Sequence, residues 1–117
     1  MRILLTVNGT DLPATLNDSA AARDFASLLP LTLSLSDFHR NEKIADLPKR
    51  LSIKGAPSGT AANAGDLTYY SPWGNLAIFY RDFGHSQGLV SLGHIDAPLD
   101  PLISIADGTT LTVVAAQ

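Results

Sequence analysis

The chain has no cysteine, which excludes disulfide bonds and a thiol nucleophile. Charge is also scarce: eight Lys and Arg residues stand against eleven Asp and Glu residues, giving a formal net charge of −3. The basic residues are scattered along the chain. Because nucleic-acid binding relies on clustered Lys and Arg, we expect no nucleic-acid partner.

Long apolar runs are missing as well. No run approaches the roughly 18 residues of a membrane span, so we expect no membrane association. The opening MRILLTVNG has an apolar run shorter than the core of a signal peptide and is followed by turn residues. We therefore expect a cytoplasmic protein whose first residues form a strand.

The length of 117 residues permits one domain with a single core and leaves no room for a second. Hydrophobic residues make up 45% of the chain and charged residues 16%, as in a globular rather than a disordered protein. We expect residues 1–117 to form one domain.

Aromatic residues are few but concentrated. Of the eight in the chain, four Phe, three Tyr and one Trp, six lie within YYSPWGNLAIFYRDFG at residues 69–84. Such a cluster can be ordinary core packing, or it can line a groove that binds a ligand.

Alternation of apolar and polar residues predicts most of the secondary structure. Leu31, Leu33 and Leu35 alternate with Thr and Ser in the clearest strand of the chain. Pro13 would confine its own strand to an edge or a bulge. Strands are predicted at residues 2–8, 11–16, 31–36, 42–47, 66–70, 76–80, 89–95 and 109–115.

Helical spacing appears in one long segment and one short one. Asn17, Asp18 or Ser19 can cap a helix that Pro30 ends. Asp100-Pro101 can begin a short helix over residues 102–106. Residues 54–65 have no period and predict a surface loop, and residues 82–88 predict a glycine-containing link.

These elements predict a mainly β fold with one main helix and one short helix. Many turn signals and the need to avoid free strand edges favour a small closed or nearly closed β-barrel. An SH3-like or sandwich arrangement is the alternative.

The segments GDLTYYSPWGNLAIFY and GLVSLGHID, followed by a short helix, Asp-Gly and a last strand, resemble the small cyclophilin-like proteins of bacteria and archaea. The resemblance covers nearly the whole chain and implies a cyclophilin-type barrel. More distantly, the chain is similar to cyclophilin peptidyl-prolyl isomerases. In those enzymes an arginine hydrogen bonds the prolyl nitrogen and an apolar pocket holds the ring, which lowers a barrier of about 18–20 kcal/mol.

The resemblance implies a groove on the outer face of the barrel. Successive side chains of a strand point to opposite faces, so Tyr69 and Tyr70 must diverge, as must Phe79 and Tyr80, and only half of the aromatic residues can line one surface. The candidate groove residues are Phe38, Tyr69, Tyr70, Trp73, Ile78, Phe79 and His85.

Two arginines are candidates for catalysis. Phe38-His39-Arg40 spells the tripeptide that carries the catalytic arginine in many cyclophilins. Here, however, Arg40 is followed by Asn-Glu-Lys and lies in a predicted turn, so a solvated turn arginine is the alternative. Arg81 follows the aromatic strand, but Asp82 can simply pair with it.

Other chemistries find little support. The three histidines lack metal-ligand spacing, and Gly55 to Gly59 lacks the lysine of a phosphate-binding loop, so we expect no metal and no cofactor. His85-Ser86 and Asp82 have the residue types of a hydrolase triad, but adjacent side chains rarely converge as nucleophile and base.

Three hypotheses remain. The first is a barrel that binds a small molecule or an extended peptide in an aromatic groove. The second is a peptidyl-prolyl isomerase with a non-standard arginine, acting on a proline-containing peptide. The third is a structural domain with Trp73 in a homodimer interface.

Overall fold

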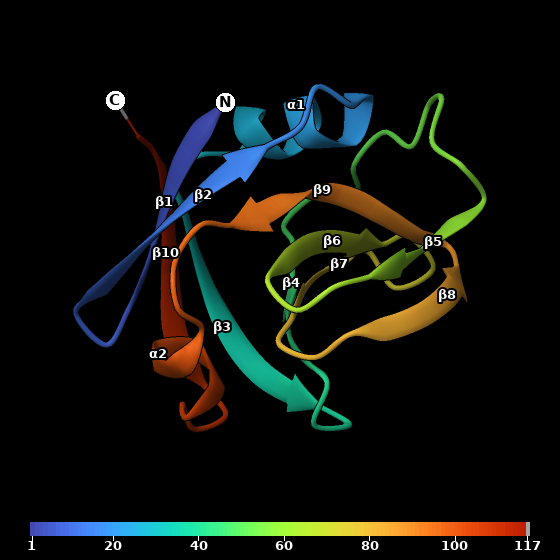
Figure 1. The fold of residues 1–117 in the computed structure, drawn as a ribbon. Helices are drawn as coiled ribbons and strands as arrows, with labels where there is room; N and C mark the ends of the chain where they lie inside the picture. The colour runs from blue at the N-terminus through green and yellow to red at the C-terminus, as the bar shows by residue number, and fades with distance from the viewer. Residues whose placement is uncertain (117) are drawn as a thin grey trace.

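The computed structural model describes residues 1–116, which form ten strands and two helices (Figure 1). The first half of the chain contains β1 (Arg2–Val7), β2 (Thr10–Leu16), α1 (Ala20–Ser27), β3 (Leu31–Phe38), β4 (Glu42–Asp46) and β5 (Gly59–Ala62). The second half contains β6 (Asp66–Tyr70), β7 (Asn75–Phe79), β8 (Phe83–Gln87), β9 (Leu89–Ile95), α2 (Asp100–Ile103) and β10 (Thr109–Ala115).

Eight of these strands close into an antiparallel barrel in the order β1-β10-β3-β4-β7-β6-β9-β2. Closure leaves no unpaired edge in this sheet, which is the reason that turn-rich β chains favour it. The inward residues of β1, namely Ile3, Leu5 and Val7, are each only 1% exposed. The prediction of a mainly β barrel with one main helix and one short helix is confirmed.

The predicted turn at Asn8-Gly9 joins β1 and β2 in the first hairpin. Asn8 and Gly9 have φ angles of 49° and 77°, the left-handed conformation that a two-residue hairpin turn needs at both central positions. The expectation that Pro13 would confine β2 to an edge or a bulge was wrong, because β2 pairs with both β1 and β9. Pro13 lies just beyond the part of β2 that pairs with β9, which covers only Ala14 to Leu16, so its missing N–H costs no bond to β9.

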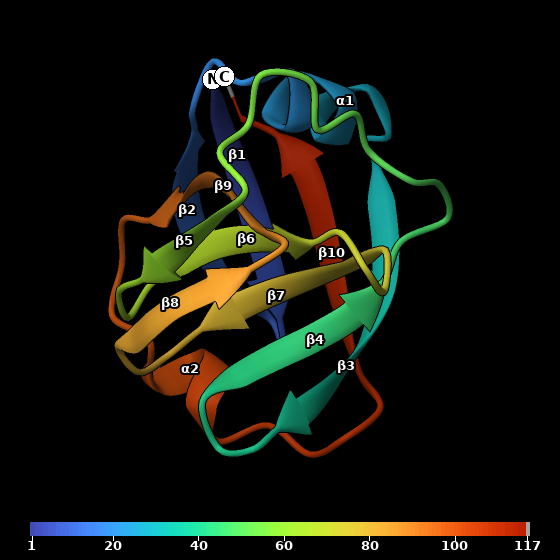
Figure 2. The same ribbon diagram turned by 90° about the vertical axis from the view of Figure 1, so that its right-hand side faces the viewer.

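The two helices lie at opposite ends of the barrel (Figures 1 and 2). Ser19 caps α1, because its Oγ accepts a hydrogen bond of 3.1 Å from the backbone N–H of Ala22. Phe25 of α1 and Leu102 of α2 both pack into the barrel core. The short helix ends at Ile103, earlier than the predicted residue 106.

The predictions of a loop at 54–65 and a link at 82–88 were wrong in part, because β5 and β8 lie there and pair with each other. Neither strand alternates apolar and polar residues, so the sequence carries no period-two signal. Small residues allow the backbones to approach closely: a Cβ built on Gly59 would lie 2.4 Å from the carbonyl oxygen of Ser86. Ala62 packs against Phe79 and Leu89, which holds this small sheet on the outer face of the barrel (Figure 2).

Neither helix in the described part of the chain is long and apolar enough to cross a membrane.

Candidate functional site

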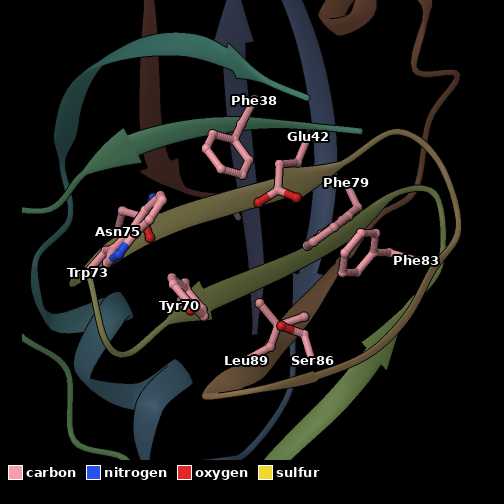
Figure 3. Close-up of a pocket in the computed structure, with 9 residues that line it drawn as sticks. All are labelled: Phe38, Glu42, Tyr70, Trp73, Asn75, Phe79, Phe83, Ser86 and Leu89. Carbon is pink, nitrogen blue, oxygen red and sulfur yellow. The ribbon is translucent and has the colours of Figure 1, made fainter. Parts of the chain in front are cut away.

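A pocket of about 190 Å³ opens on the outer face of the barrel, beside β8 (Figure 3). Its walls come from six strands, β3, β4, β6, β7, β8 and β9, and from the β6–β7 turn. Nine residues line it: Phe38, Glu42, Tyr70, Trp73, Asn75, Phe79, Phe83, Ser86 and Leu89.

Strand register brings most of these residues together. Phe38 of β3 lies directly opposite Glu42 of β4, and Glu42 lies directly opposite Phe79 of β7. In antiparallel pairs, opposite residues share a face with their Cβ atoms about 4.5–5.5 Å apart. The carboxylate of Glu42 is therefore flanked by a phenyl ring on each neighbouring strand.

A second row of opposed residues forms the other wall. Tyr70 of β6 lies opposite Asn75 of β7 on one side and Leu89 of β9 on the other. Two residues of β8 complete the lining: Phe83 lies next to Phe79, and Ser86 lies next to Leu89 (Figure 3).

Five aromatic rings surround the space in two contacting groups. Trp73 meets Phe38 and Tyr70 edge to face, with centroid distances of 5.4 and 5.3 Å. The rings of Phe79 and Phe83 lie 5.5 Å apart. Trp73 is 56% exposed and Phe83 39% exposed, so each group reaches solvent at the rim.

Glu42 is the one carboxylate in the lining, and it points into the space between the rings (Figure 3). Among residues 1–116, no Lys, Arg or His side chain makes a salt bridge with it. Burial among apolar side chains, and secondarily the negative charge of Asp37, raises the pKa of Glu42 to about 7.

Asp37 itself faces away from the pocket and is fully engaged. Its carboxylate pairs with the buried Lys43 at 3.2 Å and accepts a hydrogen bond of 2.5 Å from the hydroxyl of Tyr80. Burial acts to raise the pKa of Asp37, but the hydrogen bonds from Tyr80, the Arg40 backbone and Lys43 together lower it. The positive charge of Lys43 is therefore balanced by Asp37 and leaves Glu42 without a partner.

Asn75 adds a second unsatisfied polar group. Its side chain is 2% exposed, and its Oδ1 has no hydrogen-bond partner within the described chain. Buried amide oxygens are normally paired, so this one marks a place where a donor is missing. A half-turn of the side-chain amide would let Asn75 offer either its oxygen or its nitrogen.

Four of the predicted groove residues line the pocket: Phe38, Tyr70, Trp73 and Phe79. Tyr69 and Ile78 instead point into the barrel core, at 1% and 0% exposure. The hydroxyl of Tyr69 accepts a hydrogen bond of 3.2 Å from the backbone N–H of Leu51. The prediction that Tyr69 and Tyr70 diverge is confirmed.

His85 is exposed on β8 and does not reach the pocket lining. Sequence reasoning missed Glu42, Asn75, Phe83, Ser86 and Leu89. A signal existed for Glu42, since a tight turn after Phe38 places Glu42 across from it. None existed for Ser86, because its strand was not predicted.

Neither candidate arginine lines the pocket. His39 and Arg40, with φ angles of 54° and 57°, form the centre of the β3–β4 turn, which the hydrogen bond of 3.1 Å from Asn41 N–H to Phe38 O closes. The prediction of a turn at Arg40 is confirmed. Arg81 is exposed after β7.

Residues 1–116 contain no group of three or more His, Asp or Glu side chains that could hold a metal ion.

Comparisons with known proteins agree with this architecture. The solution structure of a hypothetical protein from Archaeoglobus fulgidus is similar over 99% of this chain and 95% of that chain, with a TM-score of 0.72 and 18% identity. At that identity the similarity shows the fold alone. No curated protein matches the sequence. A model of the family described as "Cyclophilin-like family" matches residues 5–114, and the chain therefore belongs to the cyclophilin-like family.

Proposed function

We propose that this barrel binds a small organic ligand in the pocket beside β8. The observation that carries the proposal is the ring of five aromatic side chains around an open space, with Trp73 56% exposed at its rim. Exposed aromatic area is costly in water, and a ligand that enters would bury it. A few polar groups within such a lining are typical of small-molecule sites.

The size of the pocket limits the ligand. At about 190 Å³ it is smaller than the roughly 300–1,000 Å³ of sites for drug-sized molecules. A ligand of one ring, or a single side chain of an extended peptide, matches this volume.

The lining favours binding over prolyl isomerisation. Isomerase chemistry of the cyclophilin type needs an arginine at the edge of the pocket, and the lining offers Glu42 instead. Glu42 could donate the hydrogen bond that weakens the amide resonance only in its protonated form, which is a neutral group and not a cation like arginine. Arg40 and Arg81 stay outside the lining, so the isomerase hypothesis has less support than the binding hypothesis.

Fluorescence of Trp73, the only tryptophan in the chain, tests the proposal directly. We expect saturable changes with some members of a panel of one-ring cations, neutral molecules and anions. Tyr69→Phe is the matched control, because its ring lies in the core, whereas Tyr70→Leu should weaken binding. If no compound binds and sedimentation shows a dimer with Trp73 shielded from quenchers, a homodimer interface replaces this proposal.

A further inference from the structure

We propose that the ligand is a small organic cation with N–H donors, such as a protonated amine, held by Glu42 within the aromatic pocket. This inference rests on the proposed function and specifies the chemistry of the same site. Three independent features of the pocket carry it: the carboxylate without a partner, the surrounding rings and the unsatisfied amide of Asn75.

The half-buried carboxylate of Glu42 has no opposite charge beside it among the described residues. Phe38 and Phe79 are its direct neighbours across both ladders, and no basic side chain of residues 1–116 forms a salt bridge with it. A charge among apolar groups is costly unless an opposite charge pairs with it. An ammonium group in the pocket would supply that charge.

The aromatic rings favour the same ligand. A cation within about 6 Å of a ring centroid is attracted by the negative face of the ring, most strongly for Trp and Tyr. Here Tyr70 and Trp73 are in contact at one end of the pocket, with a centroid distance of 5.3 Å, and Phe79 and Phe83 lie at the other end. An anion would meet both the rings and Glu42 unfavourably.

Asn75 offers an acceptor for an N–H group of the cation. Its buried Oδ1 has no donor among the described residues, and the hydroxyl of Ser86 is also in the lining. A primary or secondary ammonium can donate to Glu42 and to one of these groups at once. A quaternary ammonium has the charge but no donor.

A charge series of nearly equal shape provides the test. Benzylammonium, benzyltrimethylammonium, benzyl alcohol and benzoate are titrated by Trp73 fluorescence and by calorimetry at about pH 8, one unit above the Glu42 pKa of about 7. We expect benzylammonium to bind at least about tenfold more tightly than benzyl alcohol, with the quaternary compound weaker than benzylammonium and benzoate undetectable.

Variants then assign the effect to Glu42. Glu42→Gln should weaken benzylammonium about tenfold and leave benzyl alcohol unchanged. Asp18→Asn, at an exposed position outside the pocket, removes the same charge and should change neither affinity. Thermal unfolding of both variants shows whether they remain folded.

A further arm separates the two sources of an ammonium group. A blocked peptide with one central Lys is compared with butylammonium and with the same peptide carrying norleucine. Tighter binding of the Lys peptide than of butylammonium assigns the site to a protein side chain, and the reverse assigns it to a free amine.

The outcomes distinguish this inference from the proposed function. If benzyl alcohol or benzoate binds as tightly as benzylammonium, the inference of a cationic ligand is wrong, but the pocket still binds ligands. If no member of this series binds, the cation proposal fails, and the wider panel of one-ring compounds decides whether the pocket binds any ligand.

Discussion

The hydroxyl of Tyr80 donates a hydrogen bond of 2.5 Å to Asp37, which also pairs with Lys43. Asp37 lies one residue before Phe38, so the two side chains point to opposite faces of the β3–β4 hairpin. The ring of Phe38 lines the pocket on the outer face, and Asp37 lies on the inner face. The inner face holds a carboxylate with both a cation and a hydroxyl. The outer face holds Glu42, which has neither among the described residues.

Loss of Asp37 should destabilise the fold. Lys43 is 4% exposed and would lose its counter-charge in Asp37→Ala, which we expect to cost about 3 kcal/mol in the free energy of unfolding. Lys43→Met keeps the packing without a buried charge and should stay within about 1 kcal/mol of the native chain. Urea unfolding measures both. Equal losses in the two variants would contradict this account of the pair.

Glu42 should make stability depend on pH. Its pKa is raised from 4.5 to about 7, first by burial and then by Asp37. Between these values the folded state holds a proton that the unfolded state has lost, so this group lowers the free energy of unfolding as pH rises through that range. Glu42→Gln should therefore raise Tm at about pH 8, by roughly 4 °C or 1 kcal/mol after allowance for solvent screening. At about pH 4 the native chain and Glu42→Gln should have the same Tm, because Glu42 is then protonated in both the folded and the unfolded state. A difference as large as at pH 8 would argue against titration of Glu42.

Cation affinity should follow the same ionisation in the opposite sense. Benzylammonium stays charged across the range, so its binding should strengthen as pH rises through about 7 and Glu42 loses its proton. The other ionisable groups nearby are Asp37 on β3, held by Lys43, and Tyr70 in the lining. The affinity for benzylammonium is measured against pH in the native chain and in Glu42→Gln. If affinity rises with pH equally in the variant, another group is responsible for the pH dependence.

The adjacent residues Tyr69 and Tyr70 should separate stability from binding. Tyr69→Phe leaves the backbone N–H of Leu51 without its acceptor and should cost about 1 kcal/mol of stability with no change in ligand affinity. Tyr70→Leu keeps apolar packing but removes a ring from the pocket, so its main effect should be on affinity, several-fold at benzylammonium. Denaturation and titration of each variant provide the comparison. Reversed effects would mean that the pocket is misplaced.

Prolyl isomerisation should be absent or unrelated to the pocket. Arg40 occupies a turn and Arg81 is exposed, so Arg40→Ala and Arg81→Ala should bind benzylammonium like the native chain. In a peptide assay we expect no acceleration of cis-trans exchange by any of the three proteins. Activity that disappears only in Arg40→Ala would restore the isomerase hypothesis.

The sequence alone determined much of the barrel. Alternation at Leu31, Leu33 and Leu35, the cap at Ser19 and the Asn8-Gly9 turn are local signals, because each depends on residues a few positions apart. The same local rule separated Tyr69 from Tyr70. It also placed Arg40 in a turn, which already weakened its catalytic role.

The tertiary structure decided the site. β5 and β8 form because they pair with each other. The local pattern of apolar and polar residues does not predict this pairing. Glu42 becomes the centre of the pocket because register sets it between Phe38 and Phe79, and its raised pKa follows from the apolar surroundings that these strands create. Alternation tells which face a side chain takes. Only long-range strand pairing decides which distant residues share that face. It therefore also decides which charged groups are removed from water without an opposite charge beside them.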